Sequence, residues 1–92
     1  MIDIRGISKA KILAALYNAS KPQGRGYLQF TPSPMTESEA QVHIENQTYF
    51  DYLKGRVMRV DLSGDSLDPW GYDRDNGEGA AENAILKAME ND

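Results

Sequence analysis

The 92-residue sequence contains no cysteine and only one histidine, His43. The lack of cysteine excludes a disulfide scaffold, a CxxC zinc site and cysteine-based catalysis. His43 falls within a predicted helix and has no recognisable nucleophile pattern beside it, so we interpret it as a surface or core-edge residue. We therefore expect a protein that is not an enzyme and that uses no cofactor and no catalytic metal.

Long apolar runs are also missing. No stretch approaches the roughly 18 apolar residues that a membrane span needs, and residues 1–6 lack the basic and apolar regions of a secretory signal. We therefore expect a cytoplasmic protein. A chain of this length fits one domain, residues 1–92, and its small core makes a homo-oligomer a natural expectation.

Positive charge is unevenly distributed along the chain. The net charge is −4, which argues against ordinary nucleic-acid binding because phosphate neutralisation needs a basic surface. Residues 1–60 carry a net charge of +3, whereas residues 61–82 contain seven acids and one cation, Arg74, for a net charge of −6. The chain is electrically polarised.

Capping and periodicity predict three helices. Ser8 can cap a helix that ends near Ala19, and Thr36 with Glu39 forms a capping box for a second helix that ends near Gln47. A third helix is predicted over residues 80–90. The apolar stripes of the first and third helices are Ile12, Leu13, Leu16 and Tyr17, and Ala81, Ala84, Ile85, Ala88 and Met89.

Two segments alternate as strands do. Residues 26–31 place Leu28 and Phe30 on one face, and residues 56–62 place Met58, Val60 and Leu62 on one face. We expect these segments to pair antiparallel, while residues 48–54 fit either a helical or an extended conformation. The fold class is therefore a small single α+β domain, with a short antiparallel sheet packed against two or three helices.

The segment 61–79, called the acidic segment below, joins the second strand to the last helix over about 19 residues. Loops longer than about 12 to 15 residues tend to be functional or disordered, and Trp70 and Tyr72 favour an ordered loop with its own packing. These two aromatic residues are candidates for ligand stacking. The alternative is that both close the edge of the core.

Asn76, Gly77 and Gly79 precede the last helix and can leave backbone N–H groups open for an anion, with Arg74 assisting. The alternative is an internal cap within residues 75–78. A second candidate is the basic segment 21–27, where Lys21, Arg25 and Tyr27 suit a phosphate or carboxylate ligand, although a turn with solvated charges explains the same residues.

Calcium is a further alternative for the acidic segment, because alternating oxygen ligands suit a hard cation. Asp73, Asp75 and Glu82 resemble part of the short excalibur calcium motif, DxDxDGxxCE. Gly77, Glu78 and Ala81 depart from that motif, and the EF-hand register also fails because Glu78 stands where its glycine belongs.

Three strings cover much of the chain, namely KPQGRGYLQF over 21–30, YFDYLKGRVM over 49–58, and DLSGD with YDRDNGEGAA over 61–65 and 72–81. In these strings the chain resembles a family of small uncharacterised accessory proteins of bacteriophages and prophages. The resemblance implies a phage protein in the host cytoplasm, and by analogy one that antagonises host defence.

Two hypotheses follow from the resemblance and the charges. In the first, the protein sequesters a nucleotide-derived immune signal: Tyr27, Tyr52, Trp70 or Tyr72 stacks on a base, and Lys21, Arg25, Arg56 or Arg74 binds phosphate. In the second, the protein is an anti-CRISPR-like inhibitor whose acidic residues Asp65, Asp68, Asp73 and Asp75 imitate nucleic acid. Aromatic residues and glycines accompany the charges in both candidate segments, which favours ligand binding.

Overall fold

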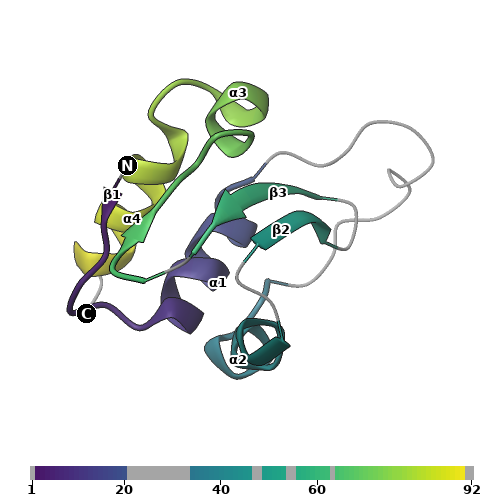
Figure 1. Cartoon of the computed structure of the whole chain (residues 1–92), viewed down its shortest axis with the longest axis vertical. Coiled ribbons are helices and arrows are strands. Elements are labelled where there is room, and N and C mark those ends of the chain that lie inside the picture. Colours follow the sequence, from purple (N-terminus) through teal and green to yellow (C-terminus); the bar gives the residue numbers. More distant parts are fainter. Residues whose placement is uncertain (1, 21–33, 47–48, 54–55, 63, 91–92) are drawn as a thin grey trace.

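A computed structural model describes residues 2–20, 34–46, 49–53, 56–62 and 64–90. The described part is an α+β domain, as the sequence predicts (Figure 1). Its helices are α1 (Lys9–Ala19), α2 (Glu37–Asn46), α3 (Tyr72–Asn76) and α4 (Ala80–Glu90). Its strands are β1 (Ile2–Asp3), β2 (Tyr49–Leu53), β3 (Arg56–Asp61) and β4 (Ser66–Leu67).

The strands form two antiparallel pairs. β2 pairs with β3, with a register shift between Phe50 and Tyr52, so residues 49–53 of the ambiguous segment are extended. β1 pairs with β4. The predicted pairing of residues 27–30 with β3 lies outside the described residues, and the neighbour that the structure gives β3 is β2.

α1 contacts α2, α4 and β3, and therefore lies at the centre of the domain. Ser8 caps this helix as predicted, because its hydroxyl oxygen accepts a hydrogen bond from the Lys11 N–H at 3.3 Å. The predicted stripe Ile12, Leu13, Leu16 and Tyr17 is fully buried. Burial of such a side chain stabilises the fold by roughly 1.5–3 kcal/mol.

The residues that precede α2 are hydrogen-bonded to the last turn of α1. The side-chain oxygen of Asn18 accepts a hydrogen bond from the Met35 N–H at 2.8 Å, and its amide nitrogen donates to the Met35 carbonyl at 3.2 Å. Thr36 then accepts a hydrogen bond from the Glu39 N–H at 3.2 Å, which confirms the N-terminal half of the predicted capping box.

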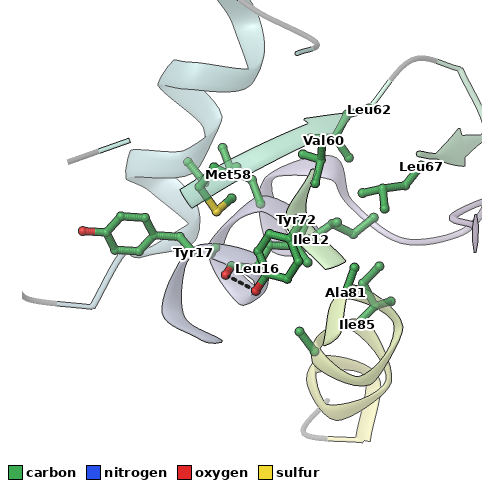
Figure 2. Packing of buried hydrophobic residues seen from close by; sticks show 14 of the residues in the cluster. Ile12, Leu16, Tyr17, Met58, Val60, Leu62, Leu67, Tyr72, Ala81 and Ile85 are labelled. Atoms are coloured by element: carbon green, nitrogen blue, oxygen red, sulfur yellow. Dashed lines mark hydrogen bonds between the residues drawn. The ribbon is translucent and has the colours of Figure 1, made fainter. Parts of the chain in front are cut away.

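The core lies between β3, α1 and α4 (Figure 2). Met58, Val60 and Leu62 are fully buried, which confirms the predicted inward face of β3. Figure 2 shows the ring of Tyr72 beside Ile12 and Leu16, with Ala81 and Ile85 of α4 below it.

The inward stripe of α4 is shorter than predicted. Ala81, Ala84 and Ile85 are buried, but Ala88 is only half-buried and Met89 is 48% exposed. Ala88 and the alanines of α1 line the same hollow. Because these side chains are small, they leave the last turn of α4 incompletely covered. The helix itself ends at Glu90, as predicted.

Candidate functional site

The acidic segment is mostly regular structure. It contains β4 and α3, and Asp61 and Asp68 exchange two backbone hydrogen bonds of 2.9 Å. The Gly71 N–H donates to the Arg59 carbonyl at 3.2 Å, which ties the start of α3 to β3. The prediction of an ordered segment with its own packing is confirmed, but the segment is not one long irregular loop.

Tyr72 is a core residue. Its side chain is fully buried, and its hydroxyl donates a hydrogen bond of 2.7 Å to the Leu16 carbonyl, drawn as a dashed line in Figure 2. Leu16 lies near the carboxyl end of α1, where carbonyl groups lose their helical partners. The prediction that Tyr72 stacks on a ligand is therefore wrong, and the alternative of a core residue is correct.

Trp70 differs from its neighbour Tyr72 because its side chain is 46% exposed. Arg74 is also exposed, at 62% of its side-chain surface. The backbone between them is helical, since the Asp73 N–H donates to the Pro69 carbonyl and the Asp75 N–H to the Gly71 carbonyl, both at 3.1 Å. A spacing of four residues in a helical turn places Trp70 and Arg74 on the same face.

Two arginines flank Asp75 beside this turn. Its carboxylate oxygens lie 3.9 Å from the Arg59 Nε and 3.8 Å from the Arg74 Nε. Oδ2 of Asp75 is buried and has no hydrogen-bond partner among the described residues. The two guanidinium groups therefore share one loosely held carboxylate. We call Arg59, Trp70, Arg74 and Asp75 the arginine–tryptophan site.

Gly71 is essential to the geometry of the arginine–tryptophan site. A Cβ atom at this position would overlap the Cβ of Arg59 and lie 2.7 Å from its Cδ. The Arg59 side chain therefore runs against the bare backbone of Gly71. The sequence analysis did not identify Arg59, which alternates with the inward residues Met58 and Val60 of its strand. The glycine between Trp70 and Tyr72 was the available signal.

The backbone before α4 is already hydrogen-bonded. The Asp73 carboxylate accepts from the Ala81 N–H at 2.9 Å, and the Ala80 N–H donates to the Gly77 carbonyl at 3.0 Å. The Gly77 N–H donates to the Asp73 carbonyl at 2.8 Å. The cap is internal, as the alternative held, but Asp73 provides the carboxylate instead of residues 75–78.

The other residues predicted for the anion site also have structural roles. Gly77 and Gly79 have φ values of 115° and 78°, which favour glycine, and the Asn76 side chain donates to the Tyr72 carbonyl at 3.0 Å. These residues shape the chain between α3 and α4. Their predicted role as an open anion site has no support in this geometry.

The four acids of the mimicry hypothesis have different surroundings. Asp65 is exposed and Asp68 is half-buried, whereas Asp73 caps α4 and Asp75 lies between two arginines. Asp73 is also one of the three residues of the calcium alternative. Among the residues that the structure describes, no group of three or more histidine, cysteine, aspartate or glutamate side chains is arranged to hold a metal ion.

Several predicted site residues cannot be placed. Lys21, Arg25 and Tyr27 lie outside the described residues. Tyr52 and Arg56 belong to β2 and β3 by their backbone pairing, but their side chains are not described. His43 is half-buried on α2.

An open hollow lies away from the arginine–tryptophan site, between α1 and α4. It is lined by Ala15, Ala19, Ala84 and Ala88, with Asn18 and Lys87 at its rim, and it encloses about 380 Å³. The sequence analysis did not identify it. Its signal was the four-residue spacing of alanines on each helix.

Comparison of the chain with family models, with curated proteins and with solved structures gives no match. No helix in the described part of the chain has the length and apolar character of a membrane span.

Proposed function

We propose that this protein is a phage accessory protein that binds and sequesters a nucleotide-derived signal of host defence, with the arginine–tryptophan site as part of the binding surface. The observation that carries the proposal is the pairing of an exposed indole and an exposed guanidinium on one anchored turn. The indole of Trp70 can stack on a base, and Arg74 can meet a phosphate.

The charge at this site supports an anionic ligand. The Asp75 carboxylate lies nearly 4 Å from the Nε of Arg59 and of Arg74, which is longer than a charge-assisted hydrogen bond of about 2.7–2.9 Å. A phosphate group can therefore form closer contacts with the exposed guanidinium of Arg74 than Asp75 does.

The energies show how much of the ligand this site can hold. Stacking of one base contributes about 1–3 kcal/mol, and a hydrogen bond to a charged group about 1.5–3 kcal/mol. Together these two contacts contribute about 2.5–6 kcal/mol, which corresponds to dissociation constants from above about 10 mM to tens of micromolar, because 1 mM corresponds to about 4.1 kcal/mol. Tight sequestration requires further groups, and the basic segment 21–27 supplies the candidates Lys21, Arg25 and Tyr27.

Isothermal titration calorimetry tests this proposal with a panel of cyclic dinucleotides, cyclic oligonucleotides and cyclic ADP-ribose derivatives. We expect one compound to bind with micromolar or tighter affinity and to be recovered unchanged by mass spectrometry. Trp70→Ala and Arg74→Ala should each weaken binding by about tenfold or more. Val42→Ala and Arg5→Ala are matched controls, because Val42 is 59% exposed on α2 and Arg5 is exposed beside β1.

If no compound of the panel binds, the proposal is wrong. Turnover of the bound compound would replace sequestration with catalysis. Equal losses in the test and control variants would show that the effect comes from the fold and not from the site.

The protein–protein alternative has one observation in its favour. Asp65, Glu78 and Glu82 are exposed, so part of the acidic segment does face solvent. Its test is capture from host lysate before and after the double substitution Asp65→Lys and Asp68→Lys, with identification of the captured protein. Asp73 is left intact because its loss would also uncap α4. Mimicry predicts capture of a nucleic-acid-binding protein, lost in the double variant and retained in Trp70→Ala.

A further inference from the structure

The carboxyl end of α3 contains the dipeptide Asn76-Gly77, and Asn76 is the only asparagine of the sequence that precedes a glycine. An asparagine in this position can lose its amide nitrogen without an enzyme. The backbone nitrogen of the next residue attacks the side-chain carbonyl carbon, and glycine permits the approach because it has no Cβ atom and few conformational restrictions. The sequence therefore places a chemically reactive pair at the end of α3.

The structure holds the two reacting groups on different carbonyl groups. The Asn76 side-chain nitrogen donates a hydrogen bond of 3.0 Å to the Tyr72 carbonyl, one turn earlier in α3. The Gly77 N–H donates to the Asp73 carbonyl at 2.8 Å. Attack requires the Gly77 nitrogen to give up its proton and to turn toward the Asn76 side chain, so its hydrogen bond must break. The reaction therefore has to wait until the last turn of α3 opens.

The last turn of α3 is suited to local opening. The helix has five residues, and Gly77 and Glu78, which follow it, are exposed. The anchor of α3 lies at its other end, where the buried Tyr72 donates its hydroxyl hydrogen bond to the Leu16 carbonyl. Short segments with exposed backbone open at a lower free energy than the core does. The last turn can therefore open while the core stays closed.

We propose that Asn76 is a site of spontaneous deamidation and that the opening of α3 sets the rate. In the open segment the Gly77 nitrogen loses its proton and forms a bond to Cγ of Asn76. The bond between Cγ and Nδ2 breaks, and the amide nitrogen leaves as ammonia, which gives a five-membered succinimide ring. Water then adds to one of the two ring carbonyl carbons and opens the ring. Position 76 becomes aspartate or isoaspartate.

The modification changes both α3 and the charge beside it. A carboxylate at position 76 only accepts hydrogen bonds, so it cannot replace the Asn76 amide as a donor to the Tyr72 carbonyl. Isoaspartate also lengthens the main chain, because the chain then runs through the side-chain carbon. Each product adds a negative charge next to Asp75, the carboxylate between Arg59 and Arg74. Deamidation therefore loosens α3 and changes the electrostatics of the arginine–tryptophan site, whatever ligand that site binds.

Peptide mass spectrometry of the full chain tests the proposal, after incubation in slightly alkaline buffer with the protein either folded or in concentrated urea. One tryptic peptide, residues 75–87, contains both Asn76 and Asn83, so each sample carries its own reference. In urea, Asn76 should convert at least about tenfold faster than Asn83, because Ala84 follows Asn83 and its Cβ hinders the attack. Folding should slow the conversion of Asn76 at least about tenfold, because only the open form reacts.

Two variants separate the opening of α3 from unfolding of the whole domain. Tyr72→Phe removes the hydrogen bond that anchors α3, and it should speed the conversion of Asn76 in the folded protein at least about threefold, with no change in urea. Ser8→Ala is the matched control, because it removes the cap at the opposite end of α1 from Leu16. It should leave the conversion of Asn76 within about twofold of the parent. Circular dichroism confirms that each variant is folded.

Four results would overturn the proposal. Asn76 could fail to convert in urea, or it could convert equally fast in urea and in the folded protein. Ser8→Ala could accelerate the conversion as strongly as Tyr72→Phe, which would place the reaction in the globally unfolded chain. The folded parent and the folded Tyr72→Phe variant could both remain without product after the urea sample has fully converted, which would show that opening of α3 does not expose Asn76 to the reaction.

Discussion

Replacement of Tyr72 by phenylalanine tests directly whether this residue belongs to the core or to a ligand site. The substitution removes only the hydroxyl, which donates a hydrogen bond of 2.7 Å to the Leu16 carbonyl. Tyr72 and Leu16 are both fully buried, so water cannot replace the lost donor without entering the core. The aromatic ring keeps its place, and no cavity of ring size forms.

The magnitude follows from the unpaired carbonyl. Leaving a buried acceptor unsatisfied costs about 1–3 kcal/mol, and we expect a loss of about 2 kcal/mol in the free energy of unfolding. For a domain of 60–100 residues each kcal/mol lowers the melting temperature by about 4–8 °C, so Tm should fall by about 8–16 °C. Tyr72→Ala should cost about 3–5 kcal/mol, because it also removes the ring.

Urea denaturation followed by circular dichroism measures the loss, and an unchanged slope with urea concentration shows that the same surface is exposed. Trp70→Phe, two residues away, is the control and should change stability by less than about 0.5 kcal/mol because Trp70 is half exposed. A Tyr72→Phe variant with parental stability would refute the core role. A Tyr72→Phe variant with parental stability and lost ligand binding would assign Tyr72 to the ligand site instead.

Substitutions at three further contacts test the cap of α4, the packing of Gly71 and the pairing of Asp3 with Arg5. Asp73→Ala should destabilise the protein by about 1 kcal/mol, since it removes the acceptor of the Ala81 N–H, and Asp73→Asn should retain most of the stability; chemical denaturation of both variants separates the cap from the charge. Gly71→Ala should cost about 1–3 kcal/mol, because the new methyl group overlaps the Arg59 side chain, and a variant of unchanged stability would contradict this close packing. The hydrogen bonds from Arg5 lower the pKa of Asp3 from 3.8 to about 2, so the stabilising contact is complete above pH 3.8 and is lost as pH falls through about 2. An NMR titration of the Asp3 carboxyl should show this pKa, and Arg5→Ala should return it to near 3.8.

The helix starts could be predicted because their chemistry is local. Ser8 and Thr36 each lie within three residues of the N–H group that they accept, so the sequence contains both partners of each bond. The inward face of β3 was also predictable, because alternation needs only one strand. The conformation of residues 49–53 was not predictable from their own periodicity. This short segment forms a strand through its pairing with β3.

The two aromatic residues of the acidic segment show where sequence reasoning reached its limit. Trp70 and Tyr72 lie two residues apart with similar neighbours, yet one is half exposed and the other is in the core. The difference arises from the Leu16 carbonyl, 56 residues earlier in the chain. The cap of α4 was missed for a similar reason: α3 turns the chain back, so Asp73 reaches the Ala81 N–H across eight residues.

These contacts also change the meaning of the charge on the acidic segment. A net charge of −6 over residues 61–82 favours a nucleic-acid mimic if every carboxylate faces outward. Asp73 instead accepts a backbone hydrogen bond, and Asp75 lies between Arg59 and Arg74. Among the described residues of 61–82, the outward negative charge is therefore concentrated at Asp65, Glu78 and Glu82. The sum of the charges along a segment therefore does not give the charge at one point on its surface, and the proposal of an anionic ligand rests on the two arginines beside Asp75.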